Sequence, residues 1–216
     1  MVTSSLAVPL GAIRLSPGSH LLIEDVSWED YEGFLTELGE TRRSPRINFC
    51  CRTLEMMAPL PAHERPNRII ADVVKVLLDV QERDWEDFGS TTFRKPQVAG
   101  LEPDTCFYIQ HAEQMRLCDR FEVDRDPPPD LAIESDVTSK TTFEAYRLLQ
   151  VPEVWIYANG SLVIQLLQNG QYRQSLTSGV FPSLPIAEMI PGLIEQARRV
   201  GARRMLRQLR DDLPSQ

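Results

Sequence analysis

The stretch Pro127–Lys140, with the sequence PPPDLAIESDVTSK, decides the fold of this chain. Three prolines precede an apolar strand pattern whose acids fall on every second position, and a Thr-Ser-Lys turn then leads into a helix. Because side chains on a strand alternate between its faces, Asp130, Glu134 and Asp136 are expected on the same face. Burying carboxylates on an apolar strand is costly unless a positive charge accompanies them. A divalent metal ion is the obvious candidate for that charge.

The composition is typical of a globular protein with one hydrophobic core. The 216 residues are 42% hydrophobic and 25% charged. No apolar run approaches the roughly 20 residues that a membrane span needs, and no basic segment followed by an apolar one marks a secretory signal. The cysteines form no C-x-x-C pair and are expected to be reduced thiols rather than a disulfide frame or a zinc site. We therefore expect a cytoplasmic protein without membrane contact.

The net charge of −8 limits how the chain can meet nucleic acid. Binding over a whole surface depends on neutralised phosphates, so an acidic protein needs a focused basic groove or a bridging metal. Positive charge gathers near the C-terminus, at Arg198, Arg199, Arg203, Arg204, Arg207 and Arg210. A solvated helix face is the commoner role of such a series, and a DNA contact is the alternative.

Hydrophobic periodicity and turn residues predict alternating helices and strands. Ser27 is expected to cap the first helix and Pro66 to begin the second. The expected elements are a helix over 28–38, strands within 46–57, a helix over 66–80, a short strand at 91–95, a strand at 101–109, a helix over 139–149, strands at 151–157, 162–167 and 172–176 joined by turns at Asn159-Gly160 and Asn169-Gly170, and a helical segment over 186–209 interrupted near Pro191-Gly192. This order is typical of an α/β protein with a mixed central sheet flanked by helices.

A second acid-led strand lies upstream of the opening stretch. Its motif is Pro103-Asp104, followed by an apolar run. If the two strands pair in one sheet, they are only about 5 Å apart, and Asp104 and Glu134 could share one Mg²⁺, a hard cation that takes oxygen ligands. Lys140, on the turn that follows, could reach back over the site to stabilise a developing oxyanion. Metal, acids and a lysine together suit phosphodiester cleavage.

These motifs resemble the PD-(D/E)XK nuclease superfamily and, more narrowly, the restriction endonuclease-like family that is abundant in cyanobacteria. The likeness runs from about Arg46 to Tyr172 and is most specific between Pro128 and Trp155. The residues that carry it are Glu102-Pro103-Asp104, the run from Pro128 to Glu134, Thr138-Ser139-Lys140, Tyr146, and the run from Val151 to Trp155. The resemblance implies a restriction endonuclease-like core. It also implies a Mg²⁺-dependent endonuclease, with Mn²⁺ as a substitute, that hydrolyses phosphodiester bonds in nucleic acid, DNA before RNA.

The resemblance also assigns roles by position. Asp104 is the acid of the Pro-Asp motif and Glu134 the second acid, and both are implied metal ligands. The superfamily's lysine belongs two residues after the second acid, where this chain has Asp136. Lys140 is the nearest substitute for that lysine. Asp136 is then either a third metal ligand or a residue that holds Lys140 in place.

Members of the superfamily often carry an acid on the helix before the sheet. The candidates for that position here are His63 and Glu64. On a helical wheel extended back from the stripe of Ile70 and Leu77, His63 falls near the inward side and Glu64 away from it. The wheel therefore favours His63 as the residue that faces the site.

Other conspicuous side chains are expected to be structural. Tyr146 and Trp155 are expected to be core aromatics, and Asp130, beside the proline turn, a structural acid rather than a ligand. His20 and His111 lack companions in the sequence and receive no role.

We expect one domain over residues 1–216. It has an N-terminal arm and helix over 1–45, a nuclease-like core over 46–176 and a C-terminal helical extension over 177–216. The extension and the strands after Trp155 offer surfaces for a homodimer.

A catalytically inactive descendant of the nuclease fold, serving as a binding or assembly module, is the alternative hypothesis. The acid at position 136, where the superfamily has its lysine, and the acidic net charge motivate it. The nuclease hypothesis predicts divalent-dependent nicking of DNA that Asp104→Ala and Glu134→Ala abolish. The alternative predicts neither cleavage nor binding of Mg²⁺ or Mn²⁺.

Overall fold

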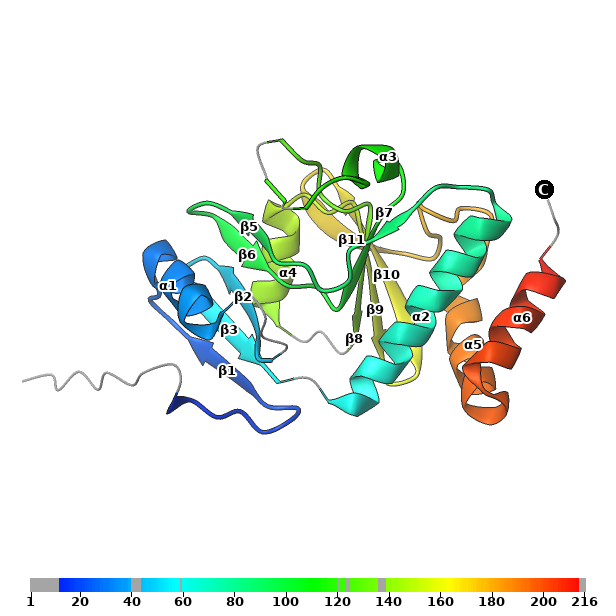
Figure 1. Cartoon of the computed structure of the whole chain (residues 1–216), viewed down its shortest axis with the longest axis horizontal. Helices are drawn as coiled ribbons and strands as arrows, with labels where there is room; N and C mark the ends of the chain where they lie inside the picture. The colour runs from blue at the N-terminus through cyan, green and yellow to red at the C-terminus, as the bar shows by residue number, and fades with distance from the viewer. Residues whose placement is uncertain are drawn as a thin grey trace, which may run out of the picture.

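The computed structural model describes residues 12–39, 44–58, 60–119, 121–122, 125–135 and 139–213, without the side chains of residues 61–63. In this part of the chain, the strands form two sheets, one of five strands and one of six. Figure 1 shows helix α4 (Lys140–Leu148) between the two sheets and helix α2 (Pro61–Val80) along the other face of the second sheet. No helix in these ranges is long and apolar enough to cross a membrane.

The first sheet comes from the N-terminal half of the chain. Its order is β1-β3-β2-β6-β5, and each neighbouring pair is antiparallel. The bounds are β1 His20–Ile23, β2 Arg46–Cys50, β3 Thr53–Met57, β5 Phe93–Lys95 and β6 Ala99–Leu101. Helix α1 (Trp28–Leu38) covers this sheet, and the ring of Tyr31 stacks on that of Phe49 at 5.0 Å. Gly100 allows this approach, because a Cβ there would lie 1.9 Å from the Tyr31 hydroxyl oxygen.

The second sheet is mixed and holds the opening stretch at its centre. Its order is β11-β10-β9-β8-β7-β4. The bounds are β4 Glu86–Asp87, β7 Thr105–Tyr108, β8 Leu131–Ser135, β9 Glu153–Ala158, β10 Ser161–Gln168 and β11 Gln171–Ser175. Strands β8 and β9 are parallel with α4 as their crossover, and the other neighbouring pairs are antiparallel.

Alternation along β8 divides the core into two layers. The remaining helices are α3 Ala112–Met115, α5 Ile186–Val200 and α6 Ala202–Asp212. Leu131 and Ile133 pack in the layer that includes α2, α5 and α6, whereas Ala132 packs in the layer that includes α4. This confirms the predicted alternation for these residues. Glu134 shares its parity with Ala132 and therefore faces α4.

The local capping and turn predictions are confirmed. Oγ of Ser27 accepts from the N–H of Asp30 at 3.0 Å, and the Asp30 carboxylate accepts from the N–H of Ser27 at 3.1 Å, which makes a capping box at the start of α1. Both residues of Asn159-Gly160, and both of Asn169-Gly170, have positive φ, as tight hairpin turns require.

Two predicted helix boundaries are wrong. Helix α2 begins at Pro61, where a missing N–H costs nothing, and Pro66 lies inside the helix instead of starting it. The C-terminal helical segment runs through Pro191 and is divided at Gly201, whose φ of 90° ends α5 and turns the chain into α6. In both places a proline was expected to mark a helix boundary, but the boundary lies at another residue, Pro61 for α2 and Gly201 between α5 and α6.

The α/β class with a mixed central sheet is confirmed, and one strand prediction needs correction. The expected strand at 101–109 is divided between β6 and β7, which belong to different sheets. Pro103 lies between them and has no N–H to contribute to a ladder, so the chain crosses from one sheet to the other at this point. Strand β4, only two residues long, was not predicted.

Candidate active site

The structure brings Asp104 and Glu134 together at the end of the β7–β8 pair. The antiparallel register pairs Thr105 with Ile133, and its continuation sets Asp104 opposite Glu134. Both are buried, with 6% and 3% of their surface exposed. The N–H of Ser135 donates to Oδ2 of Asp104 at 2.7 Å, which ties the start of β7 to the end of β8.

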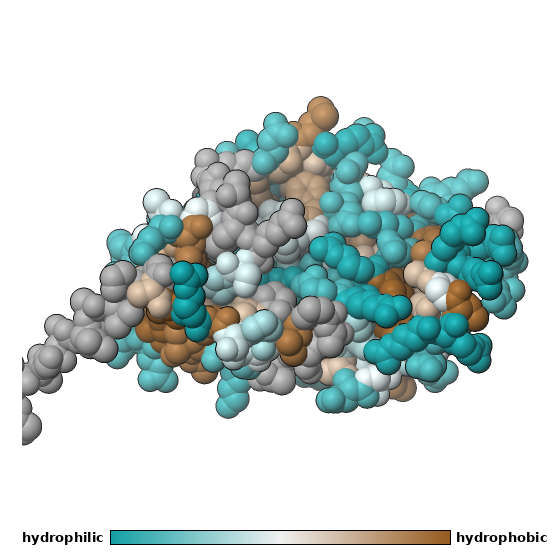
Figure 2. Space-filling model, turned by 60° about the horizontal axis from the view of Figure 1, so that its bottom comes forward, coloured by the Kyte–Doolittle hydropathy of each residue, from teal (hydrophilic) through white to brown (hydrophobic). Residues whose placement is uncertain are grey.

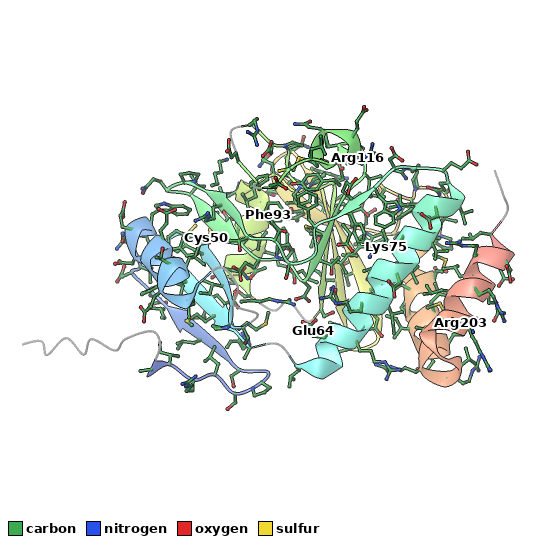
Figure 3. The ribbon with its side chains drawn as sticks, viewed as in Figure 1. Cys50, Glu64, Lys75, Phe93, Arg116 and Arg203 are labelled. Atoms are coloured by element: carbon green, nitrogen blue, oxygen red, sulfur yellow. The ribbon has the colours of Figure 1, made fainter. Side chains whose placement is uncertain are left out.

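Arg46, the first residue of β2, brings a positive charge to these acids from the other sheet. Its Nη1 forms an ion pair with Oδ1 of Asp104, and its Nη2 lies 2.7 Å from Oε1 of Glu64 on α2. The Arg46 side chain is 10% exposed and that of Glu64 36%. Figure 3 labels Glu64 at the start of α2. One guanidinium therefore joins the first sheet, the second sheet and α2.

Hydrogen bonds from Glu102 hold β2 beside this junction. The buried carboxylate of Glu102 accepts from the N–H of Ile47 at 3.0 Å and from the hydroxyl of Thr92 at 2.9 Å. The N–H of Glu102 donates to Oδ1 of Asn48 at 2.9 Å. These bonds hold Ile47 and Asn48, which follow Arg46, against Glu102, which precedes Asp104 by two residues. They therefore keep Arg46 close to Asp104.

Glu134 accepts a hydrogen bond from a residue of α4 and has a raised pKa. The hydroxyl of Tyr146 donates to Oε1 of Glu134, and Tyr146 is itself buried. Burial raises the pKa of Glu134 to about 7, because desolvation outweighs the Tyr146 hydrogen bond and the charge of Arg46, which both lower it. The nearby carboxylate of Glu55 adds to the rise in pKa. Burial and Glu134 also raise the pKa of Tyr146, so the phenol stays a donor.

A second buried network supports the α4 side of the site. Nδ2 of Asn48 donates to the Thr142 hydroxyl at 2.8 Å, and that hydroxyl donates to Oε2 of Glu55 at 2.8 Å. Nδ1 of His20 lies 3.6 Å from Oε1 of Glu55. These contacts join β1, β2, β3 and α4. They hold α4 in the position from which Tyr146 contacts Glu134.

Asn67 of α2 holds the α2 side of the site in place. Its Oδ1 accepts from the hydroxyl of Thr105 at 2.6 Å, and its Nδ2 donates to the carbonyl of Ile133 at 3.3 Å. Since Thr105 and Ile133 are the register pair next to Asp104 and Glu134, one buried amide holds α2 against both acid-bearing strands.

The other predicted site residues are not joined to this pair in the described structure. Lys140 is the exposed first residue of α4, and within the described ranges it has no hydrogen bond or ion pair. Asp136 and the side chain of His63 lie outside the described residues, so their predicted roles stay predictions. Glu64, which the wheel placed away from the site, contacts Arg46.

The structure also shows which residues local sequence patterns missed. Arg46 appeared only as the start of a strand, and Tyr146 as a core aromatic. An arginine at a strand start is not itself a signal, because its partners come from a different sheet and a helix. The buried Tyr146 keeps its predicted core position and in addition donates to Glu134.

One further acid, Asp130, and the histidines His20 and His111 have partners in the structure. Asp130 is buried at the opposite end of β8, where its Oδ2 accepts from the N–H groups of Ile109 and Gln110 at 2.7 and 2.9 Å. Nδ1 of His111 lies 3.2 Å from Oδ1 of Asp130. This agrees with a structural role for Asp130, and it gives His111, like His20, an acidic companion that the sequence did not reveal.

The donor chemistry of the site fits a hard divalent cation. Asp104 and Glu134 offer oxygen ligands, and Glu64 and Glu55 add negative charge around the single guanidinium of Arg46. Within the described ranges, no three Asp, Glu, His or Cys side chains are grouped closely enough to hold an ion. Asp104 and Glu134 are thus two of the ligands that an ion would need, and Arg46 is the present counter-ion of Asp104.

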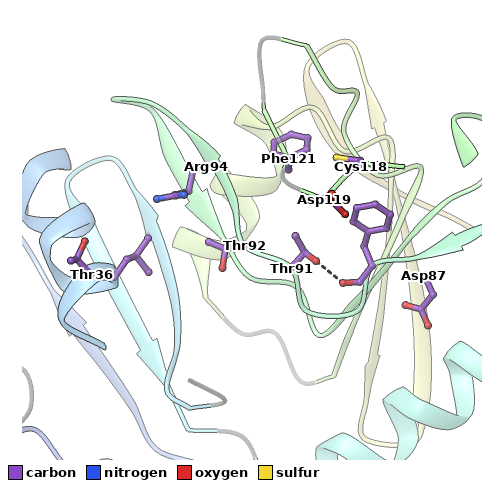
Figure 4. Close-up of a pocket in the computed structure, with 10 residues that line it drawn as sticks. Thr36, Asp87, Thr91, Thr92, Arg94, Cys118, Asp119 and Phe121 are labelled. Carbon is purple, nitrogen blue, oxygen red and sulfur yellow. Dashed lines mark hydrogen bonds between the residues drawn. The ribbon is translucent and has the colours of Figure 1, made fainter. Parts of the chain in front are cut away.

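A separate open cavity of about 650 Å³ lies away from these acids. It is lined by residues of α1, β5 and the segments around Thr91 and Phe121, including Thr36, Arg94 and Asp119 (Figure 4). Neither Asp104 nor Glu134 lines it. Because the described residues around this cavity include no group of acids that could hold a metal ion, we place the chemistry at the acid pair.

Comparison with known proteins gives a family and a fold. Residues 28–198 match the model of the Uma2 family, whose description is "Putative restriction endonuclease". A crystal structure described as "a putative nuclease belonging to DUF820" from Anabaena variabilis has a TM-score of 0.53 and 14% sequence identity, over 84% of this chain and 99% of that one. At this identity the similarity shows the fold alone. No curated protein matches the chain in a sequence search.

Proposed function

Because the chain belongs to the Uma2 family, described as "Putative restriction endonuclease", we propose that it is a metal-dependent endonuclease that hydrolyses phosphodiester bonds of DNA. The observation that carries the proposal is the buried pair of Asp104 and Glu134, set opposite each other at the end of two neighbouring strands. Two neighbouring carboxylates supply the oxygen ligands that a metal-assisted hydrolysis needs.

Asp104 and Glu134 would hold Mg²⁺, or Mn²⁺ in its place, and Asp136, which stands where the superfamily has its lysine, would be either a third ligand or a residue that holds Lys140 in place. When bound, the ion would lower the pKa of a water molecule and stabilise negative charge on the phosphate. The N–H of Ser135 orients Asp104, and the hydroxyl of Tyr146 orients Glu134. Glu134, with a pKa near 7, gives up its proton as positive charge accumulates beside it.

Arg46 positions Asp104 until another cation takes over its charge. Its Nη1 holds Oδ1 of Asp104, and Glu64 anchors the other end of the guanidinium at 2.7 Å. Glu64 is partly exposed, so Arg46 can stay paired with it when Asp104 is released. Lys140, the exposed first residue of α4, is proposed as the cation that approaches the phosphate from solvent.

A cleavage assay tests the proposal. Supercoiled plasmid, linear duplex and RNA are incubated with the protein in Mg²⁺, in Mn²⁺ and in EDTA. We expect nicking of DNA with either metal and none in EDTA, with a loss of at least about 10²-fold in Asp104→Asn and Glu134→Gln. Glu113→Gln, which removes an exposed acid from α3, is the matched control and should keep full activity. Equal cleavage by all four proteins would refute this mechanism, and cleavage of RNA alone would refute the DNA assignment.

A binding or assembly module built on the nuclease fold is the second candidate. Its supporting observation is that both oxygens of Asp104 already have protein partners, Arg46 and the N–H of Ser135. For such a module, no divalent-dependent cleavage is expected on any nucleic acid. Calorimetry would also show no binding of Mn²⁺ that depends on Glu134.

A further inference from the structure

Exposed arginines cover one side of the C-terminal helices and the start of α2. We call this set the arginine surface. It consists of Arg65, Arg68, Arg198, Arg199, Arg203, Arg204 and Arg207. Figure 2 shows strongly hydrophilic side chains gathered on the right of the molecule, over α2, α5 and α6. The chain has a net charge of −8, so this surface is a local concentration of positive charge on an acidic protein.

The packing of α6 fixes how its arginines are presented. Met205 and Leu209 are buried, which places Arg203 and Arg207 on the opposite, solvent-facing side of the helix. Because the apolar stripe of α6 is already packed in the core layer under α2, it is not free to enter a lipid bilayer. The arginines thus form a fixed, hydrated face, suited to a charged and rigid partner.

An ion pair aligns this face with α2. Nη2 of Arg210 lies 3.0 Å from Oδ2 of Asp79, which holds the end of α6 beside the end of α2. Both helices run the same way in Figure 1, so the start of the shorter helix α6 lies beside the middle of α2, and Arg65 and Arg68 lie further toward the start of α2. At about 1.5 Å per residue, the arginines of α6 and those of α2 follow one another along the same direction of the two helices.

The same part of α2 contacts residues that lie next to the acid pair. Glu64 contacts Arg46, and Asn67 bonds to Thr105, on the side of α2 that faces the sheets. Arg65 and Arg68 each follow one of these residues and are exposed. In Figure 3, Glu64 and Arg203 both lie in the lower part of the view, where α2 and α6 begin. The α2 part of the arginine surface therefore adjoins Glu64 and Asn67, which contact the neighbours of the acid pair.

Intramolecular contacts account for little of this charge, although Arg68 lies close enough to Asp72 to favour its charged form. Within the described ranges, the seven side chains have no hydrogen bond or ion pair, whereas Arg210 has Asp79. Arg198 and Arg199 suit the dipole at the end of α5, but Arg203 and Arg204 stand in the first turn of α6, where the helix dipole repels cations. The acids of α6, Asp211 and Asp212, are at its far end.

We propose that the arginine surface binds the phosphate backbone of the nucleic acid and guides it to Asp104 and Glu134, an inference that rests on the proposed function. Arginine suits this role because its planar fork of donors matches phosphate oxygens. The contacts are with phosphates, so they set position and affinity without reading sequence. An acidic protein gains from confining such contacts to one face, which directs the strand toward the site.

The experiment measures binding separately from cleavage. Fluorescence anisotropy follows a labelled 30-base-pair duplex in EDTA, over a series of salt concentrations, with the full-length chain. The test variant is Arg203→Ala, Arg204→Ala and Arg207→Ala combined, which keeps good helix formers in α6. The control variant is Arg52→Ala, Arg116→Ala and Arg173→Ala combined, which removes the same charge from exposed arginines elsewhere. Vesicles of anionic lipid are titrated in parallel.

We expect the test variant to bind DNA at least about tenfold more weakly at 0.1 M salt and to lose about 2 to 3 units of the slope of log K against log salt. The control variant should keep the wild-type slope to within about 1 unit. Equal losses in both variants, no binding by the wild type at low salt, or binding only to vesicles would each overturn the inference. Nuclease function is tested separately by cleavage in Mg²⁺. DNA binding that depends on the arginine surface, without any cleavage, would refute the nuclease function and still support the inference about the arginine surface.

Discussion

Asp104 lies opposite Glu134 where β7 begins and β8 ends, and the N–H of Ser135, next to Glu134, donates to Oδ2 of Asp104 at 2.7 Å. This bond makes the relative position of the two carboxylates a property of the sheet rather than of flexible side chains. Because both acids are buried, their charge must be balanced locally. Arg46 balances part of it, and the proposed metal would balance the rest.

Replacing Arg46 tests whether that balance matters for folding. Arg46→Met leaves Asp104 buried without its counter-ion and should cost about 3–5 kcal/mol in the free energy of urea unfolding. Arg52→Met is the matched control, because the Arg52–Asp25 pair is exposed, with Nε 3.8 Å from Oδ1, and should cost less than about 1 kcal/mol. Similar small losses in both variants would show that Asp104 does not depend on Arg46.

Glu134→Gln tests the perturbed acid. The pKa of Glu134 rises from 4.5 to about 7 on folding, so between these values the folded state holds a proton that the unfolded state has lost. The contribution of this group to stability therefore falls as pH rises through that window, by roughly 3 kcal/mol in total. In EDTA, Glu134→Gln should remove this fall and be more stable than the wild type at pH 8. Urea unfolding at pH 5 and pH 8 measures the difference. Parallel pH profiles of the two proteins would contradict the raised pKa.

Tyr146→Phe tests the hydrogen bond that holds Glu134. The Tyr146 hydroxyl lowers the pKa of Glu134, so its removal should raise that pKa further and cost about 1–2 kcal/mol of stability. Tyr172→Phe is the matched control, since the Tyr172 hydroxyl donates to the Val151 carbonyl at 2.6 Å, and it should leave the pKa of Glu134 unchanged. Carboxyl ¹³C NMR titration of Glu134 gives the pKa in each protein. If the two variants shift it equally, the bond has no specific role.

Gly100→Ala tests the packing of α1 on the first sheet. A Cβ at position 100 would lie 1.9 Å from the Tyr31 hydroxyl oxygen, so the ring must move and stability should fall by about 1–3 kcal/mol. Gly33→Ala, inside α1, meets no atom within 4 Å and should instead stabilise the protein by about 0.5–1 kcal/mol. Thermal unfolding of both variants measures the two signs, and stabilisation by Gly100→Ala would contradict the contact.

Local sequence signals predicted the framework well. The capping box of Ser27 and Asp30, the Asn-Gly turns and the alternation of Leu131 to Ile133 each depend on residues close together in the chain, and the structure has all of them. The Pro-Asp and Glu motifs also lie on neighbouring strands, because antiparallel pairing of two successive strands follows from their order.

The rest of the site depends on contacts between distant elements. Arg46 meets Asp104 only because the chain crosses between sheets at Pro103, a division that hydrophobic periodicity within 101–109 does not reveal. The helical wheel placed Glu64 away from the site because a wheel describes α2 alone and does not show that Arg46, from the first sheet, reaches the Glu64 side chain. Tyr146 gains its partner from the packing of α4 between the sheets, which no spacing in the sequence specifies.

The most direct measurement is a crystal structure grown with Mn²⁺, with its anomalous difference map. The proposal predicts a peak about 2.1 Å from carboxylate oxygens of both Asp104 and Glu134, with Arg46 released from Asp104 and still beside Glu64. A map without a peak at these carboxylates, with Arg46 still paired to Asp104 at saturating Mn²⁺, would contradict a metal-dependent nuclease and favour the binding module.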